Sequence, residues 1–323
     1  MNEPLRAMNL GAILDRAIQI FRQQPTLFFG LAAIPGLVQM GTSLATVQPG
    51  ASSSVRAGAA LAVFPLQIVH LIVQAMTSGA LCLAASAVNL GGTTSVRNSF
   101  KAFSSRKASV VGLTLLQGIF AFWPLVIVAI ISAAVGAGMG AGPAAIYVQL
   151  CIWTVGGIPC LFLYARYALA FPATAIEGLP ASPSLDRSVA LSAGGRMKIF
   201  LGILVPAIPG LILTFGSIGL IAHFKASSPL LAGSPYAVLL IEATAGFIST
   251  LVFSPYGSIV LTLLYYDQRI RREGYDVERM MVAAGLDPNA ADIAAGLPQP
   301  AVPALAHGVL PALAESREGN QQA

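Results

Sequence analysis

The feature that most constrains this chain is a long stretch without charge in its middle. From Ala108 to Ala165 the sequence contains no Asp, Glu, Lys, Arg or His across 58 residues. A helix needs about 20 apolar residues to cross the hydrocarbon core of a bilayer, so this interval is long enough for two spans. The Gly-rich segment GAGMGAGPA at 136–144 is typical of a turn between them.

The same rule predicts four further spans. Over the whole chain 56% of residues are hydrophobic and only 10% are charged, against roughly 25% charged in soluble domains. Because so few charges cannot solvate the surface of a soluble fold, we expect lipid to cover part of it. The sequence therefore predicts an all-α, multi-pass membrane protein with six transmembrane helices at about 26–47, 60–90, 110–135, 145–165, 199–222 and 237–266.

Lys and Arg are distributed unevenly between the two sides of these spans. With six spans both termini lie on one side, and 16 of the 18 basic residues fall there. Only Arg56 and Lys225 fall on the other side. Cytoplasmic loops carry the excess of basic residues, so the bias predicts that both termini are cytoplasmic. The net charge of +5 then reports topology, and we expect no nucleic-acid partner because no aromatic and basic patch accompanies it.

Residues 1–25 are typical of a cytoplasmic amphipathic helix lying in the membrane interface. Polar residues fill one face of LGAILDRAIQIFRQQP, and apolar residues recur at helical spacing on the other. The apolar positions are Leu10, Ile13, Leu14, Ala17, Ile18 and Phe21.

Two later segments resemble this opening segment. ILDRAIQIFRQQPTLFFGL (13–31), SVRNSFKAFSSRKASVVGL (95–113) and SLDRSVALSAGGRMKIFLGI (184–203) share charges, a basic residue before the membrane and a Gly within it. Each precedes two predicted spans, which indicates three repeated hairpin units with interfacial helices. The alternative is that any helix entering from the cytoplasm carries a basic flank.

The segment 267–323 is predicted to be a cytoplasmic tail. Its start, DQRIRREGYDVERMM, continues the sixth helix briefly, and the Pro-, Ala- and Gly-rich remainder is expected to be disordered after Asp287. Asp267 with Arg269, Arg271 and Arg272 is interpreted as a capped, solvated helix end.

Three quoted stretches resemble one bacterial family. LGAILDRAIQIFRQQP, YALAFPATAIEGLPASPSLDRSVALSAGGRMKIFLGIL and SPYGSIVLTLLYYDQRIRREGYDVE are similar to the glycerophosphoryl diester phosphodiesterase membrane-domain proteins. The resemblance runs from about Leu10 to Glu278. In two-part members a soluble barrel carries the phosphodiesterase chemistry and opens with a His-Arg pair. Here His70, His223 and His307 are followed by Leu, Phe and Gly, so the resemblance implies a stand-alone membrane domain in the cytoplasmic (inner) membrane of a bacterium.

No catalytic set is recognisable in the sequence. There is no Walker loop, no zinc-ligand spacing, no GxSxG and no pair of carboxylates on one helix face near a His. We therefore expect no enzyme activity, no cofactor and no metal site.

Four basic residues are candidates for contacts with a phosphate-bearing lipid head group: Arg106, Lys107, Arg196 and Lys198. The alternative is that they only set topology. Pairing between the charges of the longest cytoplasmic loop is expected to fix the interfacial segment against the helices. These charges are Arg166, Glu177, Asp186, Arg187, Arg196 and Lys198.

One polar pair is expected inside the membrane. Glu242 is the only acidic residue well within a span, and His70 lies in a span that runs in the same direction. An ionisable group at membrane depth costs about 2.5–3.5 kcal/mol near the bilayer centre, so both should face the bundle interior. The alternative is an interfacial, solvated Glu242 and a His70 bonded to a carbonyl.

The function expected from these features is a non-enzymatic organiser, or a lipid- or partner-binding protein at the cytoplasmic face. Membrane lipids, anionic ones included, are the expected partners, and the sequence leaves any protein partner open. The alternative is a small-solute or lipid transporter that uses His70 and Glu242, and the third reading is a membrane enzyme acting on lipid head groups.

Overall fold

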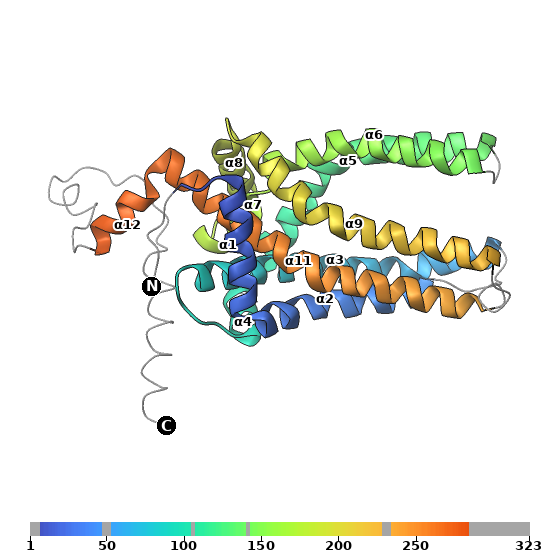
Figure 1. Cartoon of the computed structure of the whole chain (residues 1–323), viewed down its shortest axis with the longest axis horizontal. Coiled ribbons are helices and arrows are strands. Elements are labelled where there is room, and N and C mark those ends of the chain that lie inside the picture. The colour runs from blue at the N-terminus through green and yellow to red at the C-terminus, as the bar shows by residue number, and fades with distance from the viewer. Residues whose placement is uncertain (1–6, 47–52, 105–106, 140–142, 228–233, 284–323) are drawn as a thin grey trace, which may run out of the picture. The chain divides into compact units, whose positions relative to one another are not determined.

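The chain is all-α, as the sequence predicts. The computed structural model describes residues 7–46, 53–104, 107–139, 143–227 and 234–283, and every regular element in these ranges is a helix (Figure 1). The segment predicted to be disordered, after Asp287, lies outside the described residues.

Six long helices occupy the predicted spans. They are α2 (Pro25–Thr46), α3 (Ser53–Asn89), α5 (Lys107–Met139), α6 (Pro143–Tyr167), α9 (Arg196–Ser227) and α11 (Pro235–Glu273). Within the part of the chain that the structure describes, five helical segments are long and apolar enough to cross a membrane, and six when the two parts of α5, which meet at 55°, count as one span. Pro124 explains the bend in α5, because proline offers no N–H to the preceding turn.

Large apolar side chains lie exposed along these long helices. Val155 on α6 is 72% exposed and Ile212 on α9 is 67% exposed. Contiguous apolar surface of this kind is unfavourable in water and favourable in hydrocarbon. The fold is therefore that of a polytopic membrane protein.

A short helix precedes each pair of long helices. These short helices are α1 (Leu10–Gln23), α4 (Val96–Ser104) and α8 (Ala181–Ser192). The order short, long, long thus occurs three times, in agreement with the predicted repeat. Before α8 the chain also forms α7 (Ala170–Pro172) and the π-helical turn η1 (Ala173–Glu177), and α12 (Tyr275–Ala283) follows α11.

Helix α1 is amphipathic as expected. The Asn9 side chain caps its N-terminus and accepts a hydrogen bond from the Ala12 backbone N–H at 2.7 Å. Ile13, Ala17 and Ile20 are fully buried, whereas Ile18 is 47% exposed. An apolar side chain exposed next to a buried stripe is what an interfacial helix presents to lipid.

The described chain divides into two compact units. The α2–α3 unit contains Asn9–Lys107 and Gly202–Leu263, and the α5–α6 unit contains Met1–Met8, Ala108–Leu201 and Leu264–Ala323. In the α2–α3 unit, α2 and α3 lie side by side, as their blue ribbons show in Figure 1. There Thr250 on α11 donates a hydrogen bond to the Gln39 side chain on α2 at 3.0 Å.

In the α5–α6 unit, α5 and α6 run side by side, the green ribbons of Figure 1. Gly156 permits close approach, because a Cβ at this position would lie 2.2 Å from Val128 Cγ2. Polar side chains hold the same helices together, since Trp153 Nε1 donates to Ser132 Oγ at 3.1 Å and Gln149 Nε2 donates to the Ser132 carbonyl at 2.8 Å. The pair α5–α6 is thus packed by both shape and hydrogen bonds.

Candidate functional site

A π-helical turn places the central acid of the α5–α6 unit. The turn η1 begins after Pro172 and ends at Gly178, which has φ +70° and donates its N–H to the Thr174 carbonyl at 3.1 Å. Single π turns are rare in proteins, but those that do occur are often found at functional sites. This one leaves the Glu177 side chain at the end of the turn, only 8% exposed.

Helix α8 is fastened to the end of α6 by its serines. Ser188 Oγ and Ser192 Oγ both donate to the Arg166 carbonyl, at 2.9 and 3.3 Å. Ser184 accepts from Thr174 Oγ1 at 2.8 Å within the buried face. The three serines lie at i, i+4 and i+8 and so share one face of α8, which packs on the chain that leads out of α6.

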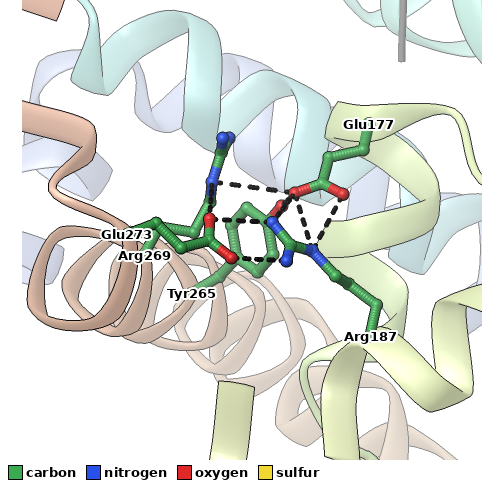
Figure 2. A network of polar contacts seen from close by, with 5 residues as sticks. All are labelled: Glu177, Arg187, Tyr265, Arg269 and Glu273. Carbon is green, nitrogen blue, oxygen red and sulfur yellow. Dashed lines mark hydrogen bonds and ion pairs between the residues drawn. The ribbon is translucent and has the colours of Figure 1, made fainter. Parts of the chain in front are cut away.

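Five side chains from three elements form one polar network (Figure 2). Arg187 on α8 donates from Nε to both Glu177 carboxylate oxygens at 3.2 and 3.1 Å, and from Nη2 to Oε1 at 2.9 Å. Tyr265 on α11 donates its hydroxyl to the same carboxylate. Arg187 also bonds Glu273, with Nη2 2.8 Å from Oε2. Arg187 therefore joins the turn after α6 to the end of α11.

The network balances two carboxylates against two guanidinium groups. Arg269 Nε lies 3.1 Å from Glu273 Oε2 and 3.7 Å from Glu177 Oε1, and its guanidinium covers the Tyr275 ring at 4.0 Å from the centroid. Burial disfavours the charge of Arg187, but hydrogen bonds to Glu273 and Glu177 outweigh it and raise the pKa of Arg187 above its ordinary value. Each carboxylate of the network thus lies against both guanidinium groups.

A second network surrounds Asp267 and corrects one interpretation from the sequence. Asp267 is not a solvated helix end, because its side chain is wholly buried. Lys198 Nζ lies 2.5 Å from Asp267 Oδ2, and Arg271 Nε lies 3.1 Å from both carboxylate oxygens. Asp267 Oδ1 also accepts the Met8 backbone N–H at 2.9 Å, while Lys198 and Arg271 donate to the Met8 carbonyl at 2.6 and 2.9 Å. The segment before α1 is thereby held through both the backbone N–H and the backbone carbonyl of Met8.

The four predicted head-group residues do not form one group in the described chain. The side chains of Arg106 and Lys107 lie outside the described residues. Lys198 has its charge compensated by Asp267. Arg196 is different, since its Nε is buried and has no hydrogen-bond partner among the described residues, a property it shares with Arg166.

His70 and Glu242 both belong to the α2–α3 unit. His70 on α3 is half-buried, and its Nε2 has no hydrogen-bond partner among the described residues. Glu242 on α11 is exposed. Among the described residues no hydrogen bond joins His70 to Glu242, so their pairing stays a prediction.

The sequence analysis did not assign roles to Tyr265 and Glu273. Tyr265, Arg269 and Glu273 lie at i, i+4 and i+8, so a helical reading of YYDQRIRRE would have put them on one face. Pairing among the charges of the longest cytoplasmic loop is found between Glu177 and Arg187, at 2.9 Å.

Chemically, the two networks are suited to holding elements in place. Each carboxylate oxygen that would act as a base already accepts hydrogen bonds from cations or from the Tyr265 hydroxyl. Within the described ranges, no three His, Cys, Asp or Glu side chains are grouped so that they could hold a metal ion. Arg166 and Arg196, which have no acidic partner among the described residues, are the groups available to bind a ligand.

Comparison with known proteins places the chain in a family. A search of curated proteins and a search of solved structures each found no significant match. The profile described as "Domain of unknown function (DUF7847)" matches residues 8–266, which is most of the chain and includes all six long helices up to Tyr266. The protein is therefore a member of the DUF7847 family.

Proposed function

We propose that the protein is a non-enzymatic membrane protein that binds anionic lipid head groups at the cytoplasmic face and organises lipid or a partner protein there. The proposal places it in the cytoplasmic membrane of a bacterium with both termini inside. Its support is the basic excess on one side of the spans and the resemblance to the phosphodiesterase membrane-domain proteins, taken without their barrel.

The observation that carries the proposal is an imbalance of charge in the α5–α6 unit. Glu177, Asp267 and Glu273 each have cationic partners within 4 Å. In contrast, Arg166 and Arg196 have no acidic partner among the described residues. Because these three acids are neutralised by their own partners, Arg166 and Arg196 are left to attract anions from outside the chain.

The experiment is lipid binding by the purified protein in nanodiscs or detergent. We expect selective binding of phosphatidylglycerol over phosphatidylcholine, weakening as salt rises because exposed charges are screened beyond about 10 Å at 0.1 M. Equal binding of both lipids at low salt would contradict the proposal.

A second function, transport of a small polar solute, has one observation in its favour. Thr77 on α3 is fully buried, and its Oγ1 has no hydrogen-bond partner among the described residues. The Nε2 atom of the half-buried His70 also has no hydrogen-bond partner among them. The two residues lie seven apart and share a face of α3. Water or a solute hydroxyl between helices would satisfy both atoms. Uptake into proteoliposomes that falls with Thr77→Val and His70→Leu would favour transport.

A further inference from the structure

Arg166 and Arg196 lie on two neighbouring helices at the same end of the α5–α6 unit. The rings of Phe162 on α6 and Phe200 on α9 are 5.8 Å apart between centroids. Arg166 follows Phe162 by four residues, and Arg196 precedes Phe200 by four. Residues four apart share a helix face. Because α6 and α9 meet through this ring pair in opposite directions, both arginines stand one turn beyond it toward the same end.

A second contact fixes the same corner of the unit. The Arg166 carbonyl accepts hydrogen bonds from Ser188 and Ser192 on α8. Gly195, which directly precedes Arg196, donates its N–H to the Ser192 carbonyl at 3.0 Å. The chain from Ser192 to Arg196 is therefore a tight connection that starts beside Arg166 and ends in the first turn of α9.

Neither of the two guanidinium groups has a counter-charge among the described residues. Both Nε atoms are buried, and neither has a hydrogen-bond partner among the described residues. The guanidinium carbon of Arg166 lies 5.6 Å from the centroid of the Tyr167 ring, its sequence neighbour. A ring face does not accept the remaining N–H groups in the way that an anion does. Two neighbouring cations with unsatisfied, buried donors are costly unless an anion lies between them.

We infer that Arg166 and Arg196 form a clamp for the phosphate group of an anionic ligand. Guanidinium groups match phosphate oxygens with paired N–H donors, whereas an ammonium acts as a point charge. The inference rests on the proposed function and makes it specific: the site lies between the ends of α6 and α9, and it includes Arg166, which the sequence analysis did not place among the head-group candidates. Lys198 is outside it, because Asp267 compensates that charge.

The shared chemistry is a phosphate group, and two sources can supply it. A phospholipid would place its head group at the helix ends and its chains along the exposed apolar surface of α6, where Val155 and Ile158 lie. A free phosphate monoester would come from the aqueous side. Phosphatidylglycerol in nanodiscs and glycerol 3-phosphate with inorganic phosphate in solution are the probes for the two sources.

The test compares two variants that remove the same charge. Arg166→Gln/Arg196→Gln removes the clamp, and Arg22→Gln/Arg97→Gln removes two exposed arginines that the topology places on the same side of the membrane. A third variant, Arg166→Lys/Arg196→Lys, keeps the charge and loses the paired donors. Thermal unfolding of all three shows that each is folded before its binding is measured by native mass spectrometry and titration.

We expect the clamp variant to bind phosphatidylglycerol at least tenfold more weakly than the wild type, the lysine variant to fall between them, and the control to stay within twofold. If both double Gln variants lose binding equally, the clamp is overturned while the anionic-lipid function stands. If the wild type ignores lipid but binds glycerol 3-phosphate or phosphate through these arginines, the lipid function fails and the clamp stands. Binding of no phosphate probe by the wild type overturns both.

Discussion

Replacing Arg187 with methionine tests whether the network of Figure 2 stabilises the fold. Methionine keeps an apolar stem of similar length and removes the charge that joins Glu177 to Glu273. Loss of one partner of a buried ion pair costs about 3–5 kcal/mol, because the other charge is left buried. Here the Glu177 side chain is 9% exposed, but Arg187 is 27% exposed and Arg269 remains 3.7 Å from Glu177. We therefore expect the free energy of unfolding to fall by about 2–3 kcal/mol.

The assay is reversible unfolding in mixed micelles by titration with a denaturing detergent, run on a double-mutant cycle. Glu177→Gln alone removes the carboxylate charge, and the double variant Glu177→Gln/Arg187→Met strands no charge. We expect the loss of unfolding free energy in the double variant to be smaller than the sum of the two single losses by at least about 1 kcal/mol. Additive effects within about 0.3 kcal/mol would refute the reasoning, since independent sites behave that way.

Three further predictions follow from the same structure. Asp267→Asn should release Met8, because the amide cannot balance the two cations around it, and hydrogen exchange of the Met8 amide should rise relative to the wild type. Gly156→Ala should lower the free energy of unfolding by about 1–3 kcal/mol, because the added methyl group overpacks against Val128. Val128→Ala in the same chain should restore stability in the unfolding titration. If Gly156→Ala alone leaves stability unchanged, the close approach of α5 and α6 is contradicted. Single-cysteine labelling should find a cysteine at Arg56 reactive from outside the cell and the termini reactive only after permeabilisation, whereas the opposite pattern would reverse the predicted topology.

The helices were predictable because a bilayer imposes a length on any chain that crosses it. The predicted spans 26–47 and 237–266 correspond to α2 (Pro25–Thr46) and α11 (Pro235–Glu273), and the difference lies at the ends. The end of α11 beyond residue 266 carries polar residues, and the sequence predicts that they continue the sixth helix briefly, as they do up to Glu273. They remain helical because Tyr265, Arg269 and Glu273 find partners along one face.

The site was only partly predictable, and the reason is the distance between partners in the sequence. Glu177 and Arg187 are ten residues apart, so a local reading could expect their pair. Asp267 was misjudged because its partner Lys198 lies 69 residues away and Met8 lies 259 residues away. The π turn that aims Glu177 also leaves no recognisable periodicity in the sequence.

The anchoring of Met8 sets an order of events during synthesis. Met8 leaves the ribosome 259 residues ahead of Asp267, which accepts its backbone N–H, and Arg271, which donates to its carbonyl, follows Asp267 by four residues. At about 5–20 residues per second, roughly 13–50 s pass between the two. The pair of Glu177 and Arg187 can form well before that interval ends. The segment before α1 therefore cannot be anchored until α11 has been synthesised, and formation of the contact between Met8 and Asp267 completes the α5–α6 unit.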